Sequence, residues 1–158
     1  MRRRLLPALI AGALLAAGVP ARPQSVPSPR SLGLGIMIGD PSGLNLKSWT
    51  GRNSAFDTGL AWSFGGGSSL QLHADLLFHE FGLFRARRGR LGLYYGLGGR
   101  VKTKEDDQTI LSVRIPLGLT YIFERAPLDL FFEVVPLLDL TPATRGDVQG
   151  AMGVRFYF

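Results

Sequence analysis

The sequence contains no cysteine, few acidic residues and only one long apolar run. Without a thiol, neither a disulfide framework nor a lipid-anchored lipoprotein is possible. Acidic residues number 12 against 18 Lys and Arg, which gives a formal net charge of +6. Arg2, Arg3 and Arg4 lie in a segment that we expect to be removed, and 15 minus 12 then leaves +3. This charge gives no ground for a nucleic-acid partner.

The single apolar run, residues 5–19, follows the basic head and precedes Val19-Pro20-Ala21, small residues at the usual cleavage spacing. About 15 apolar residues are too few to span a bilayer as a stable helix. The pattern therefore predicts a secretory signal peptide over residues 1–21, with an uncleaved amino-terminal anchor as the alternative. Residues 22–30 are rich in proline, which disfavours helix and suits an extended lead-in. The folded domain is then residues 31–158.

Most of that domain alternates apolar and polar residues with a period of two, which is the pattern of half-buried strands. Turn residues separate the alternating runs, and no amphipathic helix interrupts them. Most runs have about nine to eleven residues, the length that a tilted strand needs to cross a bilayer. We predict an all-β chain that forms an eight-stranded antiparallel transmembrane up-and-down β-barrel. The expected strands are residues 32–39, 44–49, 55–64, 70–79, 91–100, 111–121, 128–135 and 148–158.

Alternation alone does not say which face points outward, because a soluble barrel would bury its apolar face. Here the apolar face is almost wholly Leu, Ile, Val, Phe and Trp, which in water would form a continuous hydrophobic surface prone to aggregation. The other face has Gly, Ala, Ser and isolated charges, four of each sign. An equal number suits a sealed lumen, because an unpaired buried charge is costly. We expect lipid outside and a lumenal charge network of Lys47, Asp57, His73, Asp75, Arg100, Arg114, Asp129, Glu133 and Arg155.

The last run ends on an aromatic residue, although chain ends are normally frayed and polar. Gly153, Phe156 and the final Phe158 resemble the signal by which outer-membrane barrels are recognised for insertion. Such barrels close by pairing their last strand with their first, which leaves no open edge in lipid. The resemblance implies the barrel-assembly machinery as a partner during insertion.

Six stretches, the closing one included, cover nearly the whole mature chain when taken in order: residues 39–47 with Trp49, 73–79, 94–100, 114–118, 128–136 and 153–158. Together they resemble a family of small eight-stranded outer-membrane proteins of the OmpA-like transmembrane type. That family includes a domain of unknown function found in spirochaetes and other Gram-negative bacteria. The resemblance implies an integral protein of the cell outer membrane, in contact with its lipids and lipopolysaccharide, but no activity.

We expect a monomer without cofactor, with a structural or surface-interaction role. A lipid A-modifying enzyme, of deacylase or acyltransferase type, and a narrow channel are the alternatives. His73, Asp75 and His79 share one face of their expected strand. A deacylase-like site would need a serine two residues after the histidine, on a lipid-accessible face, and Asp75 stands there instead. One strand also supplies few metal ligands. We expect these residues to be lumenal hydrogen-bond partners of Arg100 or Arg114, with no catalytic or metal site.

Two smaller expectations concern the turns and one lumenal carboxylate. Four basic residues in the turn near residues 82–89 could meet lipid phosphates, but a solvated hairpin is the favoured interpretation. They are Arg85, Arg87, Arg88 and Arg90. Replacing Glu133 with leucine is expected to destabilise the barrel by leaving a lumenal arginine unpaired.

Overall fold

The computed structural model describes residues 31–63 and 67–158. The predicted signal peptide, residues 1–21, and the proline-rich lead-in, residues 22–30, lie outside these ranges. Within them, no helix has the length and apolar character that crossing a membrane requires.

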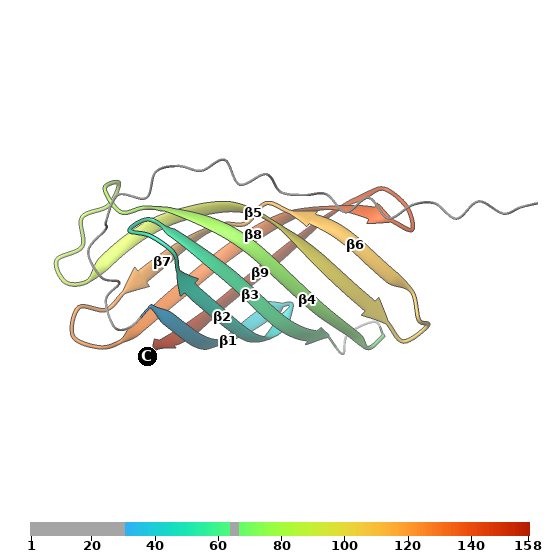
Figure 1. The fold of residues 1–158 in the computed structure, drawn as a ribbon, viewed down its shortest axis with the longest axis horizontal. Helices are drawn as coiled ribbons and strands as arrows, with labels where there is room; N and C mark the ends of the chain where they lie inside the picture. Colours follow the sequence, from blue (N-terminus) through green and yellow to red (C-terminus); the bar gives the residue numbers. More distant parts are fainter. Residues whose placement is uncertain (1–30, 64–66) are drawn as a thin grey trace, which may run out of the picture.

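In the described residues, nine antiparallel strands close into a ring, in which the last strand pairs with the first (Figure 1). The all-β barrel predicted from alternation is confirmed. The strands are β1 (Leu32–Asp40), β2 (Ser42–Trp49), β3 (Ser54–Ser63), β4 (Ser69–Glu80), β5 (Arg90–Lys104), β6 (Thr109–Arg114), β7 (Leu117–Ile122), β8 (Leu128–Thr141) and β9 (Arg145–Tyr157).

The ring nevertheless has eight strand positions, because β6 and β7 both lie between β5 and β8 and share one position. Each of these eight positions is called a stave below. The run predicted as one strand, 111–121, is interrupted at Ile115 and Pro116. A proline has no N–H to give to a sheet ladder. Backbone contacts still bridge the break: Ile115 donates to the carbonyl of Pro136 at 3.0 Å, and Gly96 donates to that of Pro116 at 2.9 Å. One stave is therefore built from two short strands.

The predicted ends of β8 and β9 were wrong, because both strands continue further than the sequence indicated. The expected strands stopped at residue 135 and resumed at 148, whereas β8 runs to Thr141 and β9 begins at Arg145. Pro136 and Asp139 look like strand breakers, yet they pair with Val148 and Arg145. Antiparallel pairing with a long partner thus overrides local propensity.

Apolar side chains point outward from the barrel and polar ones point inward. Leu97, at the centre of β5, is 61 % exposed, and Met152 on β9 is 51 % exposed, whereas Arg114 and Arg155 are each 1 % exposed. The outer surface is therefore a continuous apolar band. The charged side chains of the predicted network lie in the interior, whereas those of the turns, such as Arg88, are exposed.

The two ends of the barrel differ, and we name them by the end of the chain. The near rim carries Phe158 and the turns at residues 50–53, 81–89 and 123–127. The far rim carries the turns at Pro41, 105–108 and 142–144, together with residues 67–68. At the near rim the ring is sealed to the last residue, because Phe158 donates its N–H to the carbonyl of Leu32 at 2.9 Å.

Candidate functional site

The structure places all nine residues of the predicted network in the lumen, and each is buried. They come from seven of the eight staves, so only closure of the ring brings them together. Three of the four basic residues are each the centre of a separate group of hydrogen bonds, and the fourth is bound differently.

Arg155 on β9 uses its whole guanidinium group. Its Nη1 donates to both carboxylate oxygens of Asp129 at 3.2 Å, and its Nη2 to Asp57 at 3.3 Å. Its Nε donates to the side-chain oxygen of Asn45. The ring of Phe131 lies against the guanidinium carbon at 3.8 Å. A planar donor set suits this position, since the point charge of a lysine would not reach three acceptors at once.

Arg114 on β6 is the centre of the second group. Its Nε lies 3.0 and 3.1 Å from the two oxygens of Asp75, and its Nη2 lies 3.7 Å from Glu133. Its Nη1 donates to Gln149 at 3.3 Å, and Gln149 in turn exchanges hydrogen bonds with Gln71 across the barrel. Asp75 is therefore the main partner of Arg114, and Glu133 is a more distant one.

Arg100 on β5 has a partner that the sequence analysis missed. Its Nη2 donates to Asp139 at 2.6 Å, and Nε and Nη2 both donate to the hydroxyl of Ser112. Asp139 follows the same alternation as Asp129 and Glu133, so it could have been found had the strand been extended beyond residue 135. Asp139 adds a fifth acidic residue to the four expected, so the predicted balance of four basic and four acidic lumenal residues was incomplete.

Lys47 on β2 has no carboxylate within ion-pair distance in the described part of the chain. Its Nζ lies 2.8 Å from Nε2 of His79 and 4.5 Å from the centre of the Trp49 ring. The ring of Tyr94 is 5.4 Å away. An imidazole and two aromatic faces thus hold this ammonium group, through cation–π attraction and one hydrogen bond.

His73 departs from the expected role of hydrogen-bond partner to an arginine. Neither ring nitrogen has a hydrogen-bond partner among the described residues, and Nε2 lies 3.9 Å from Asp57. The ligand atoms of Asp57, His73 and Asp75 lie within 4.8 Å of one another, close enough for one metal ion. Both carboxylates already accept from Arg155 and Arg114, however, so a metal ion would have to displace two guanidinium groups.

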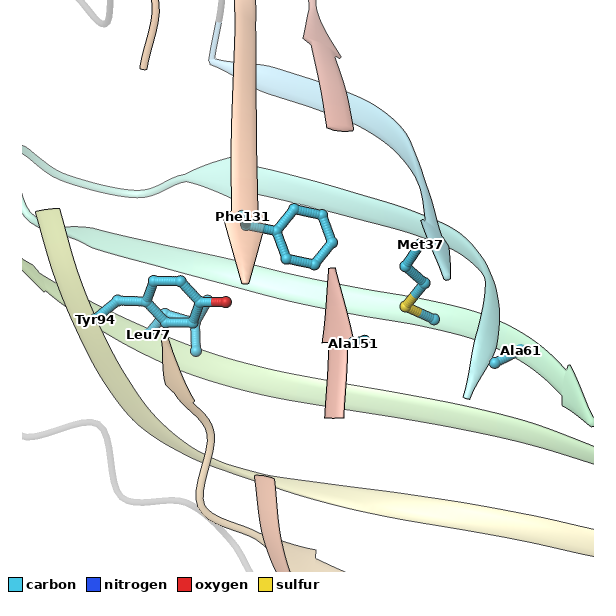
Figure 2. Close-up of a cluster of buried hydrophobic side chains, with 6 residues drawn as sticks. All are labelled: Met37, Ala61, Leu77, Tyr94, Phe131 and Ala151. Atoms are coloured by element: carbon cyan, nitrogen blue, oxygen red, sulfur yellow. The ribbon is translucent and has the colours of Figure 1, made fainter. Parts of the chain in front are cut away.

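An apolar cluster lies among these polar groups. Figure 2 shows Phe131 and Met37 in the interior, with Tyr94 beside Leu77. The hydroxyl of Tyr94 donates to Glu133 at 2.9 Å, which joins the cluster to the group around Arg114. An eight-stranded barrel is just wide enough for side chains to fill it. In this barrel, charged groups and apolar side chains both lie in the interior.

The residues of the predicted insertion signal lie on two faces of β9. Phe156 and Phe158 point outward and are 46 and 59 % exposed, with their rings edge to face at 5.3 Å. Gly153 lies on the lumenal face, where a Cβ would collide with the carbonyl oxygen of Ile36 and the ring of Phe131. Gly153 thus has a packing role of its own, and recognition by the assembly machinery stays a prediction.

No family model and no curated protein matches the chain. Among solved structures it is similar to the N-terminal β-barrel domain of Pseudomonas aeruginosa OprF, with a TM-score of 0.58 and 14% identity. The match covers 80% of this chain and 95% of that one. The fold is that of an OmpA-like barrel. The narrower resemblance to a domain of unknown function stays a prediction.

Replacing Glu133 with leucine is expected to lower the free energy of unfolding by about 1–3 kcal/mol, because the buried hydroxyl of Tyr94 loses its acceptor. Arg114 keeps Asp75, so the cost stays below that of an unpaired charge. Glu133→Gln is the matched control, since its amide oxygen can still accept from Tyr94. Urea unfolding in detergent measures both variants. Equal losses in the two would contradict this account.

Proposed function

We propose that the chain is an integral outer-membrane β-barrel protein with a structural or surface-interaction role, monomeric, and with a lumen plugged by its polar network. The observation that carries the proposal is the sidedness of the strands. Large apolar side chains cover the outer surface of all eight staves, while the arginines and their carboxylate partners are inside. In water this outer surface would drive aggregation, whereas in a bilayer it contacts the apolar acyl chains of the lipids.

Aromatic residues near the rims support a membrane environment. Trp62 lies toward the far rim on the outer face, and Tyr121 and Phe123 meet edge to face at 5.0 Å near the near rim. Such girdles flank the apolar band of membrane barrels at both interfaces. The partners that we propose are outer-membrane lipids and lipopolysaccharide, with the barrel-assembly machinery during insertion. The likeness to the OprF barrel supports the same location, the cell outer membrane.

The lumenal position of the histidines argues against a lipid A-modifying enzyme. His73 and His79 are 2 and 0 % exposed, and an acyl chain in the membrane meets only the outer face. Lipid A mass profiles with and without the protein are expected to be identical. The filled interior likewise argues against a narrow channel, and large currents across a planar bilayer would contradict a plugged lumen.

Membrane insertion itself is tested with the chain from residue 22 onward, refolded into detergent. A closed barrel keeps its strands paired in detergent until it is boiled, so we expect two bands of different mobility for heated and unheated samples. A chain that is folded and monodisperse in plain buffer without detergent would overturn the proposal.

A further inference from the structure

Two rows of apolar side chains run across the outside of the barrel, the first over five staves and the second over four, with one residue from each stave that they cross. Strand pairing defines the first row through direct partners: Leu91, Tyr121, Leu130, Val154 and Ile36. The second row is built the same way two residues further along: Leu119, Phe132, Met152 and Ile38. An apolar groove of about 480 Å³ lies between the rows, and Gly153 forms part of its wall.

The groove climbs from the near rim toward the middle of the barrel. Leu91 is the second residue of β5, whereas Ile36 is the fifth of β1, so the row starts at the rim and moves away from it. Five staves at a spacing of about 4.8 Å give a row about 19 Å long. With strands tilted by about 40°, that row rises about 12 Å along the barrel axis. One leaflet of hydrocarbon is about 15 Å thick, so the groove spans nearly one leaflet.

The rim at the foot of the groove is strongly basic. The near-rim turns, residues 50–53, 81–89 and 123–127, contain five arginines and one glutamate. The described far-rim connections, residues 41, 67–68, 105–108 and 142–144, contain three acidic residues and no Lys or Arg. No near-rim arginine forms an ion pair within the part of the chain that the structure describes. Their charge is therefore available to an anion from outside.

Tyr121 joins the groove to the basic rim. It belongs to the first row, and its hydroxyl donates to the backbone carbonyl of Arg88 at 2.6 Å, which fixes the turn above the groove. Arg125 lies in the turn between β7 and β8, two staves that line the groove. Arg88 and Arg125 are both exposed. Guanidinium groups bind phosphate through paired hydrogen bonds.

We propose that this groove binds one acyl chain of an anionic phospholipid, whose headgroup phosphate contacts Arg88 and Arg125. The occupant comes from the leaflet at the near rim, because the groove begins there and spans about one leaflet. The site rests on the proposed function, since only a barrel inserted in a bilayer meets such a lipid. It goes further by selecting one lipid class and one side of the barrel.

Tryptophan quenching by brominated lipids tests the site. Met152→Trp places the reporter on the groove wall, and Leu76→Trp places a reporter at similar depth on β4, outside the groove and 46 % exposed in the native chain. Both are made with Trp62→Phe, and the signal of the remaining Trp49 is measured in the parent and subtracted. The proteins are reconstituted in phosphatidylcholine vesicles that contain brominated phosphatidylglycerol or brominated phosphatidylcholine.

At Met152→Trp we expect brominated phosphatidylglycerol to quench at a lipid fraction at least about fivefold lower than brominated phosphatidylcholine does. Each basic residue near the membrane surface raises the affinity for anionic lipid by roughly that factor. At Leu76→Trp the two lipids are expected to quench alike. Adding Arg88→Gln and Arg125→Gln to the Met152→Trp protein should abolish the preference. Lys104→Gln with Arg145→Gln, which removes two charges near the far rim, should leave it unchanged.

Equal quenching by both lipids at Met152→Trp would overturn the inference. So would a preference that survives Arg88→Gln with Arg125→Gln, or one that is equally strong at Leu76→Trp, which would indicate general attraction of anionic lipid to the near rim. Heat-dependent gel mobility is recorded on the same vesicles. An inserted barrel without lipid preference counts against this site alone, whereas a chain that never inserts counts against the proposed function as well.

Discussion

Replacing Arg155 with leucine is expected to lower the free energy of unfolding by about 3–5 kcal/mol, the cost of removing one partner from a buried ion pair. Asp57 and Asp129 would then face each other's charge without the guanidinium between them. Asn45 would lose its donor as well. Since these residues come from four strands, the loss affects the closed ring as a whole.

Equilibrium unfolding in urea, with the protein in lipid vesicles, measures this effect. Arg85→Leu is the matched control: it removes the same side chain from an exposed turn, and should change stability by no more than about 0.5 kcal/mol. The double variant Arg155→Leu with Asp129→Asn should recover part of the loss, because one of the two unpaired charges is gone. If Arg155→Leu were as mild as Arg85→Leu, the lumenal network would not contribute to stability.

Replacing Leu97 with arginine is expected to destabilise the inserted barrel by about 2–4 kcal/mol, because Leu97 is the central residue of β5 and faces outward. The cost of an arginine on the lipid face depends on depth, since near the interface the side chain reaches water and phosphate. Thr103→Arg, on the same face of the same strand near the far rim, should therefore cost only about 0–1 kcal/mol.

The comparison of Leu97→Arg with Thr103→Arg in vesicles separates a membrane barrel from a soluble one. In water both arginines would be solvated, and the two variants would have equal stability. A depth-dependent difference supports lipid contact at the centre of β5. Equal and negligible losses would contradict the sidedness on which the proposed function depends.

The fold could be predicted from the sequence because alternation is a local property of each strand. The outward Leu97 and the inward Arg100 can be assigned within β5 alone, without knowing the neighbouring strand. The ends of the strands were less predictable. Asp139 looks like a turn residue by itself, and its pairing with Arg145 depends on the length of β9. The break at Pro116 does have a local signal, the missing N–H, but the stave continues past it.

The hydrogen-bond partners within the lumen could not be predicted, because they depend on the shear of the barrel, that is, on how its strands are staggered relative to one another. His73, Asp75 and His79 were expected to be partners of Arg100 or Arg114. Asp75 does accept from Arg114, but His79 contacts Lys47, and Arg100 reaches Asp139 on β8. Among the described residues, His73 has no hydrogen-bond partner. Sequence assigns a residue to a face, but contacts across the lumen require the relative heights of all eight staves.

The pairing of β1 with β9 sets the order in which the ring assembles. All other neighbouring strands are also close along the chain, whereas Gly33 pairs with Tyr157 across nearly the whole domain. Closing a loop of that length costs roughly 4 kcal/mol of chain entropy, and a long-range contact of this kind slows folding. We therefore expect hairpins to accumulate first and this junction to form last.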